Sequence, residues 1–124
     1  YKNDGKNKYL IYGIENRIEQ IFANLLDNAI SFSDDNKDVI VQVSKSQDDK
    51  VYIKILDEGQ GFKEKDTNKI FRRFYSNRPD KFGQHSGLGL NIVKNLVDLH
   101  NATIKASNRQ DKKGASMEIE FPKV

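Results

Sequence analysis

The stretch Gly83–Leu90 combines glycines with a helix start, an arrangement that could bind an anion. Gly87 and Gly89 lie directly before apolar residues at helical spacing, which are Leu88, Ile92, Leu96 and Leu99. A glycine-rich turn that leads into a helix exposes backbone N–H groups where the helix dipole is positive, and phosphate is the common ligand there. On this pair alone, a glycine turn before an ordinary core helix remains an open alternative.

A second polar pattern lies in residues 14 to about 32, which the sequence predicts to be the longest helix. Its apolar residues recur every three or four positions and form one face: Ile14, Ile18, Ile21, Leu25, Leu26, Ala29 and Phe32. A polar ridge is expected on the opposite side, from Gln20, Asn24, Asn28 and Ser31. Carboxamides one turn apart are unusual inside a helix, because Asn competes with its own backbone there. The Asn pair therefore stands out against a simple solvated face.

The remaining segments predict the elements that would position these residues. Alternating apolar residues predict strands at residues 8–12, 39–43, 51–55, 102–107 and 117–121, and a helical stripe predicts a second helix at 88–100. Residues 58–86 form a polar and basic connection whose length is typical of a functional lid. Its apolar cluster of Ile70, Phe71, Phe74 and Tyr75 predicts one short helix. This order indicates an α/β two-layer sandwich, with the helices on one face of a mixed, mostly antiparallel sheet.

Length, composition and charge limit the class of protein. At 124 residues the chain is one domain, large enough to bury about 65% of its unfolded surface. It has no Cys, hence no disulfide framework, and no apolar run near the ~20 residues that cross a bilayer. Its net charge of +3 is scattered, unlike the basic stripe of a nucleic-acid binder, so we expect solubility and attraction for a polyanionic ligand. Because the first residue is Tyr1, we interpret the chain as a piece of a longer protein.

Four segments resemble, in order and spacing, the motifs of one family. They are Asn24–Ala29, Asp57–Gly61, Phe71–Tyr75 and Ser86–Leu90. Together they are similar to the asparagine box, first glycine box, phenylalanine box and second glycine box of sensor histidine kinases, which share an ATP-binding fold with gyrase, MutL and heat-shock chaperones. The resemblance covers residues 10 to 122. The lid residues 74–79, 82–83 and 85–87 further resemble the ChvG type of alphaproteobacterial sensor kinase.

The resemblance implies roles at the phosphate end of a nucleotide site. Asn28 would be the protein ligand of Mg²⁺, an ion that prefers oxygen ligands and keeps several waters. Asn24 would hold a coordinated water or a phosphate oxygen. Arg73 would reach the terminal phosphate, for which the planar guanidinium is suited. The second glycine box would cradle the phosphates with Ser86, Gly87, Leu88, Gly89 and Leu90.

The resemblance also implies roles at the base end. Asp57 would accept a hydrogen bond from the adenine amino group, and guanine, which carries a carbonyl there, would be rejected. Gly59 and Gly61 would let the backbone approach the purine. Phe32 is placed either against the adenine or in the core. Ser116 either joins Asp57 around the base or is an ordinary outward strand residue.

The implied function is the ATP-binding catalytic domain of a two-component sensor histidine kinase. It would bind Mg-ATP and transfer the γ-phosphoryl group to a histidine on a separate dimerisation domain, and so serve a response regulator indirectly. We expect a cytoplasmic domain whose parent protein is anchored in the inner membrane by a part that lies outside this chain. His85 and His100 lack the flanking pattern of a phosphoacceptor, so neither is expected to be phosphorylated.

Three departures from the family leave alternatives open. Ser31 stands where many histidine kinases carry Lys or Arg, and the usual first strand and helix of the domain are not found. Asn24 stands where the chaperone and gyrase branches place a general-base Glu, which favours transfer over hydrolysis. The alternatives are an anti-sigma serine kinase, for which a carboxylate at position 24 is expected, and a nucleotide sensor that transfers nothing. A nucleic-acid module is disfavoured by the scattered charge.

Overall fold

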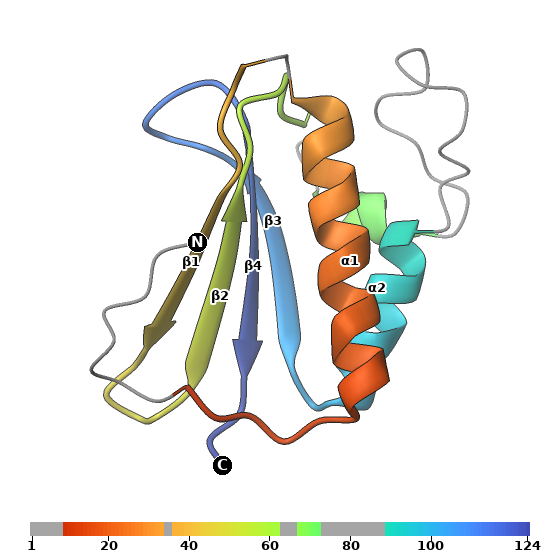
Figure 1. Ribbon diagram of the computed structural model, residues 1–124, viewed down its shortest axis with the longest axis vertical. Coiled ribbons are helices and arrows are strands. Elements are labelled where there is room, and N and C mark those ends of the chain that lie inside the picture. The colour runs from red at the N-terminus through yellow and green to blue at the C-terminus, as the bar shows by residue number, and fades with distance from the viewer. Residues whose placement is uncertain (1–8, 34–35, 63–66, 73–88) are drawn as a thin grey trace.

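The computed structural model describes residues 9–33, 36–62, 67–72 and 89–124, and Figure 1 shows the arrangement of their elements. These are α1 (Glu15–Phe32), β1 (Ile40–Lys45), β2 (Val51–Leu56), the 3₁₀ helix η1 (Thr67–Phe71), α2 (Gly89–Leu99), β3 (Thr103–Asn108) and β4 (Ala115–Phe121). The sequence predicted both helices and these four strands within one or two residues. No helix in the described ranges is long and apolar enough to cross a membrane.

The four strands form one sheet in the order β1-β2-β4-β3. β1 and β2 are joined by a tight turn, in which Ser46 N–H donates to the Lys50 carbonyl. β3 and β4 form the second hairpin, and β4 pairs with β2 in the centre. Every pair is antiparallel. As in any β-strand, successive side chains alternate between the helix side and the outer side of the sheet.

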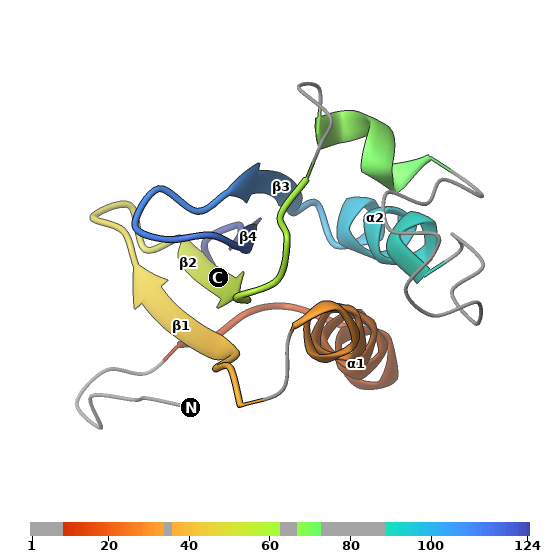
Figure 2. The ribbon, with the colours of Figure 1, turned by 90° about the horizontal axis from the view of Figure 1, so that it is seen from above.

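Both α1 and α2 cover the same face of the sheet, as the view from above shows (Figure 2). The core between the layers contains Ile21 and Leu25 of α1, Val93 and Val97 of α2, and Val51, Ile119 and Phe121 of the sheet, each at most 2% exposed. Burial of each such side chain contributes roughly 1.5–3 kcal/mol, so this contact is the main source of stability. The expected α/β two-layer sandwich is confirmed.

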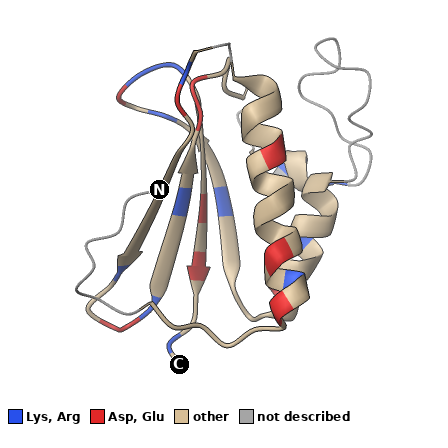
Figure 3. Ribbon diagram, in the orientation of Figure 1, with Lys and Arg blue, Asp and Glu red and all other residues tan. Residues whose placement is uncertain are grey.

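The sheet also carries charged residues, with Lys or Arg on β2 and β3 and Asp or Glu on β4 (Figure 3). The alternation of side chains along the paired strands places them on the outer face. Lys50, which directly precedes β2, approaches Glu120 of β4 at 3.2 Å, and Lys54 of β2 approaches Glu118 of β4 at 3.5 Å. The Tyr52 hydroxyl also donates to Glu120 at 3.0 Å. These exposed ion pairs contribute little each, and their main consequence is a face that tolerates water.

The prediction of a strand at residues 8–12 is wrong for residues 9–12, which are the part of this segment that the structure describes. Residues 9–12 form no strand, with Tyr9 and Ile11 half-buried against the core and Leu10 and Tyr12 exposed. The described sheet is therefore wholly antiparallel rather than mixed, because no additional strand pairs with it.

The polar ridge of α1 also lies elsewhere than expected. Asn24, Asn28 and Ser31 are half-buried and border the buried stripe, whereas the exposed side of α1 carries Glu19 and Asp27. The spacing explains this, because Asn28 follows the buried Leu25 by three positions and precedes Ala29 by one. The carboxamides thus lie at the edge of the core, where a bound ligand could reach them.

Candidate functional site

Asp57 directly follows β2 and is 4% exposed, although it carries a carboxylate. Its backbone N–H donates to the Ala115 carbonyl at 3.0 Å, which extends the β2–β4 ladder by one residue. Its Oδ1 accepts hydrogen bonds from Gly59 N–H at 2.9 Å and from Ala115 N–H at 3.1 Å. No hydrogen bond reaches Oδ2 from the described residues. The structure therefore holds one carboxylate oxygen rigidly and keeps the other as an unused acceptor.

The glycine turn after Asp57 packs directly on the end of α1. A Cβ at Gly59 would lie 2.3 Å from the Phe32 carbonyl oxygen and 3.1 Å from its carbon, so only glycine fits without a backbone shift. Gly61 has φ of +78°, a conformation that L side chains rarely adopt. Phe32 itself is 6% exposed but is not part of the main apolar cluster of the domain. The turn and Phe32 thus form a close-packed group beside the Asp57 carboxylate.

This close packing gives a prediction for stability. Gly59→Ala is expected to destabilise the fold by roughly 1–3 kcal/mol, because its methyl group meets backbone rather than a flexible side chain. Gly89→Ala is the matched control: its Cβ would have no neighbour within 4 Å among the described residues, and Ala is favoured over Gly in a helix by up to about 1 kcal/mol. Urea unfolding of both variants checks this, and equal midpoints would contradict the packing described here.

The turn between β3 and β4 closes over the same segment from the other side. The side chain of Arg109, only 3% exposed, donates from Nη1 to the Asp57 carbonyl at 3.1 Å. Its Nε and Nη2 donate to the two carboxylate oxygens of Asp111 at 3.0 and 2.7 Å. This bidentate hydrogen bond holds the pKa of Asp111 at about 2, below its ordinary 3.8. The same bonds raise the pKa of Arg109.

The lowered pKa of Asp111 predicts a loss of stability in acid. Because the folded-state value lies below the unfolded one, the pair stabilises fully above about pH 4 and this contribution disappears as the pH falls through 2. The difference in urea midpoint between wild type and Asp111→Asn is expected to be constant from pH 7 to 5. It should shrink between pH 4 and 2. A difference that persists at pH 2 would assign the effect of the substitution to something other than this ion pair.

Glu58, the residue after Asp57, forms hydrogen bonds with two other loops. Its Oε2 accepts from Asp38 N–H at 2.8 Å, and its Oε1 pairs with Lys112 Nζ at 3.3 Å. These two hydrogen bonds lower the pKa of Glu58. The loop after α1 and the turn between β3 and β4 are thereby connected through the residue next to Asp57.

Asn24 and Asn28 lie one turn apart on α1, and their carboxamides have no hydrogen-bond partner among the described residues. Ser31 lies on the same ridge. A half-buried carboxamide without a protein partner is an oxygen donor that remains available to a ligand. Ser33, which ends α1, has a buried hydroxyl that is also unpaired.

The first turn of α2 contacts η1. Gly89 and Leu90 open the helix, as the second glycine box implies, and the Asn91 side chain donates to the Phe71 carbonyl of η1 at 3.1 Å. Thr67 Oγ1 donates to the Ala106 carbonyl at 2.6 Å and fastens η1 to β3. Of the predicted residues, Arg73, Ser86, Gly87 and Leu88 lie outside the described residues, as do Phe74 and Tyr75 of the expected short helix.

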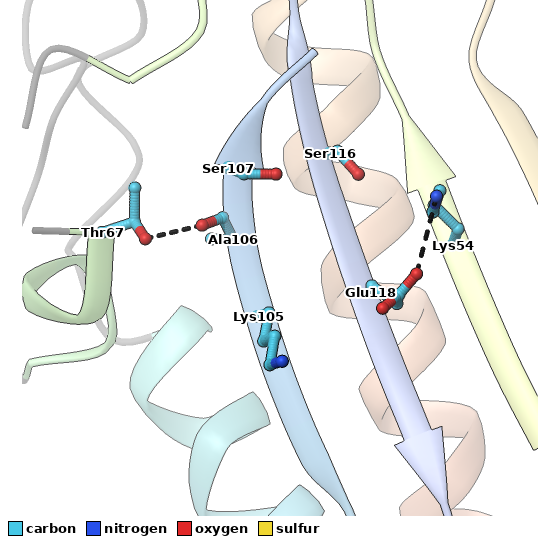
Figure 4. A pocket seen from close by; sticks show the side chains of 7 residues that line it. All are labelled: Lys54, Thr67, Lys105, Ala106, Ser107, Ser116 and Glu118. Atoms are coloured by element: carbon cyan, nitrogen blue, oxygen red, sulfur yellow. Dashed lines mark hydrogen bonds and ion pairs between the residues drawn. The ribbon is translucent and has the colours of Figure 1, made fainter. Parts of the chain in front are cut away.

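The structure does not bring Ser116 beside Asp57. Ser116 pairs with Leu56, one position before Asp57, so its side chain points to the outer face of the sheet. There it lies with Ser107, Lys54 and Glu118 (Figure 4). They help to line a cavity of about 520 Å³ on the face away from α1. The residue opposite Asp57 is Ala115, which contributes its backbone N–H.

His100 connects the end of α2 to the start of α1. Its Nε2 accepts a hydrogen bond from Ile14 N–H at 3.1 Å, which requires the ring proton to be on Nδ1, and Nδ1 lies 2.7 Å from the Leu96 carbonyl. Both ring nitrogens therefore hold backbone groups together. This position agrees with the interpretation of His100 as a residue at a helix C-terminus.

Arg109 and Glu58 were not found by sequence reasoning. Both lie in charged stretches that are typical of solvated turns, and only the fold shows that Arg109 is buried. In the sequence, Arg109 could have been recognised by Asp111 two positions later in a turn that contains Gly114. An Arg and an Asp at this spacing can form a bidentate ion pair that makes the turn rigid.

Comparison with known proteins gives a consistent result. The family described as histidine kinase-, DNA gyrase B-, and HSP90-like ATPase matches residues 13–124. Sensor protein ChvG of Agrobacterium fabrum is 37% identical over 116 residues, and that of Rhizobium meliloti is 36% identical, each over 91% of this chain. The chain spans only 19% and 20% of these relatives.

Solved structures agree with this match. The mycobacterial sensor histidine kinase MprB superposes with a TM-score of 0.82 at 25% identity, covering 90% of this chain and 76% of that one. The catalytic domain of histidine kinase ThkA superposes with a TM-score of 0.76 at 28% identity, covering 91% and 70%. The resemblance to sensor histidine kinases, including the ChvG type, is confirmed. The chain therefore belongs to the histidine kinase-, DNA gyrase B- and HSP90-like ATPase family.

Proposed function

We propose that this domain binds Mg-ATP and transfers its γ-phosphoryl group to a histidine on a separate phosphoacceptor domain. The observation that carries the proposal is the carboxylate of the buried residue Asp57, whose Oδ1 is held by two backbone N–H groups and whose Oδ2 receives no hydrogen bond from the described residues. A carboxylate oxygen that receives no hydrogen bond from the described residues is an acceptor that an N–H group of a ligand can use. The amino group of adenine is such a donor.

At the base end, Asp57 Oδ2 accepts from the adenine amino group. Guanine would place a carbonyl against the same oxygen and leave both acceptors unpaired, which is the strongest form of rejection available to a polar site. Gly59 and Gly61 carry no side chain that would keep the backbone of this turn away from the purine. The ring of Phe32 is our candidate for packing against the base.

At the phosphate end, the donors fit Mg²⁺ as the ion that accompanies ATP. The described residues contain no cluster of three His, Cys, Asp or Glu that could enclose a metal, whereas Asn28 offers a neutral carboxamide oxygen. Mg²⁺ typically takes few protein ligands beside phosphate oxygens and water, and when bound it neutralises phosphate charge. Asn24 would orient a water or phosphate oxygen one turn away. The free N–H groups at the start of α2 would face the phosphates.

Transfer is favoured over hydrolysis because no carboxylate lies on the Asn24–Asn28 ridge. Glu19 and Asp27 are exposed on another side of α1, so α1 offers no general base beside the γ-phosphate. An incoming histidine nitrogen would attack phosphorus in line, the bond to the β-phosphate oxygen would break, and ADP would leave. The lid, including Arg73, would close over the phosphates and exclude water.

The recipient histidine would belong to another domain of the parent protein, which would then serve a response regulator. We place this domain in the cytoplasm and its anchor in the inner membrane, through parts that lie outside the chain. Nucleic acid is not a proposed partner.

The test is phosphoryl transfer in trans. The chain is incubated with ATP labelled on the γ-phosphate, Mg²⁺ and the phosphoacceptor domain of its parent protein, and acid-labile phosphate on that domain is measured. We expect labelling that disappears when the acceptor histidine is replaced by Gln. Acid-stable label would indicate a serine kinase, and nucleotide binding without label would indicate a sensor.

A further inference from the structure

Asn108 and Arg109, at the end of β3 and the start of the turn to β4, form hydrogen bonds with the segment that begins at Asp57. The Asn108 carboxamide makes a reciprocal pair with the backbone of Phe62: its Oδ1 accepts from Phe62 N–H at 2.6 Å, and its Nδ2 donates to the Phe62 carbonyl at 3.0 Å. Arg109 Nη1 donates to the carbonyl of Asp57 itself. The two contacts hold the first residue of the first glycine box, Asp57, and the residue that directly follows the box, Phe62.

The turn between β3 and β4 can approach the Asp57 carbonyl closely because the residue at the point of contact is Gly114. A Cβ at Gly114 would lie 2.0 Å from the Asp57 carbonyl oxygen and 3.1 Å from Arg109 Cδ. Arg109 also anchors the turn to itself, since its N–H donates to the Gly114 carbonyl at 2.9 Å. The Arg109 guanidinium thus lies between the turn and Asp57. Its two hydrogen bonds to the Asp111 carboxylate fix its orientation.

We propose that Arg109 is a positioning residue for adenine recognition: by holding the Asp57 carbonyl, it sets the direction in which the Asp57 carboxylate points. This role of Arg109 rests on the proposed nucleotide function. The hydrogen bond from Asp57 N–H to the Ala115 carbonyl fixes the position of the Asp57 Cα. The peptide group that begins with the Asp57 carbonyl can still rotate unless that carbonyl is held by a hydrogen bond. Because Gly59 N–H is itself a donor to Oδ1, rotation of that backbone moves the carboxylate as well.

The experiment compares Arg109→Lys and Arg109→Ala with wild type in titrations with non-hydrolysable analogues of ATP and of inosine triphosphate, which carries a carbonyl in place of the amino group. Each Arg109 variant is expected to bind the ATP analogue about 10-fold more weakly, the size of one charge-assisted hydrogen bond. Affinity for the inosine analogue should change by less than about 2-fold, because that base makes no bond to Oδ2. Lys113→Ala is the control, since it removes a positive charge from an exposed position of the same turn.

A second measurement does not depend on nucleotide. Amide hydrogen exchange at Gly59 and Ala115, the two donors to Asp57 Oδ1, is expected to accelerate in Arg109→Lys without ligand. If Arg109→Ala fails to fold, Asp111→Ala takes its place, because it removes the acceptor of two of the three side-chain hydrogen bonds of Arg109. This variant is expected to lose part of the preference for the ATP analogue over the inosine analogue, to a smaller degree than the Arg109 variants.

The outcomes separate the inference from the function on which it rests. Equal losses of affinity for both analogues, or none, with unchanged exchange at Gly59 would assign Arg109 a structural role only. Wild type that binds neither analogue while exchange does accelerate would overturn the nucleotide function, and with it the recognition role, but would retain the contact between Arg109 and Asp57.

Discussion

Asp57→Asn is expected to weaken binding of an ATP analogue by at least about 100-fold, roughly 2.7 kcal/mol. The amide oxygen can replace Oδ1 and keep the hydrogen bonds from Gly59 and Ala115. The amide nitrogen then takes the place of Oδ2 and directs a donor at the adenine amino group, so two donors face each other. The measurement is calorimetric titration at a temperature where circular dichroism shows the variant to be folded.

The matched control for Asp57→Asn is Asp98→Asn. Asp98 is exposed on α2 and pairs with Lys94 at 2.8 Å, so its loss removes a carboxylate of no consequence for the site. It is expected to bind the analogue as wild type does. Stability should fall by at most about 1 kcal/mol in Asp57→Asn, because the buried acceptor remains paired. Similar affinity in the two variants would remove Asp57 from the recognition of the base.

Asn28→Ala is expected to abolish the dependence of nucleotide binding on Mg²⁺ and to reduce phosphoryl transfer by about 100-fold or more, as for other groups that position a transferring phosphoryl. Its stability should be unchanged or slightly higher, because the carboxamide has no partner among the described residues and Ala is the better helix former. Titration of the analogue with and without Mg²⁺, followed by the transfer assay, measures both effects.

Asn16→Ala is the control for this second prediction, because Asn16 is exposed in the first turn of the same helix. It should leave Mg²⁺ dependence and transfer unchanged. If Asn28→Ala instead unfolds readily and retains Mg²⁺-dependent binding when folded, the ridge of α1 has a structural role and the metal ligand lies elsewhere.

The elements of this fold could be predicted because their side-chain periods are clear. α1 and both hairpins follow from repeats of 3.6 and 2 residues, and the sheet order then buries each apolar face. Residues 9–12 are different, because all four are apolar or aromatic and do not alternate with polar residues. Whether such a segment joins a sheet depends on a partner strand, which its own sequence does not encode.

The roles of Asn24, Asn28 and Asp57 follow from the resemblance of their segments to the family's motifs, and they stay predictions. The site was not predictable where a residue's role depends on register. Ser116 is one position from the residue that faces Asp57, and a shift of one reverses the face of a strand. The burial of Arg109 depends on how closely two loops approach at Gly114, a distance set by the whole fold. The ridge of α1 lies beside the buried stripe and not opposite it, because Asn24 and Asn28 each follow a buried residue by three positions.

The measurement that tests the central claim most directly is calorimetric titration of the wild-type chain with a non-hydrolysable ATP analogue, in the presence and absence of Mg²⁺, with the matching GTP analogue beside it. We predict one site per chain, tighter binding with Mg²⁺, and a preference for adenine of at least about 100-fold. Binding of both nucleotides with equal affinity, or of neither, would contradict the assignment of Asp57 and Asn28 to a Mg-ATP site.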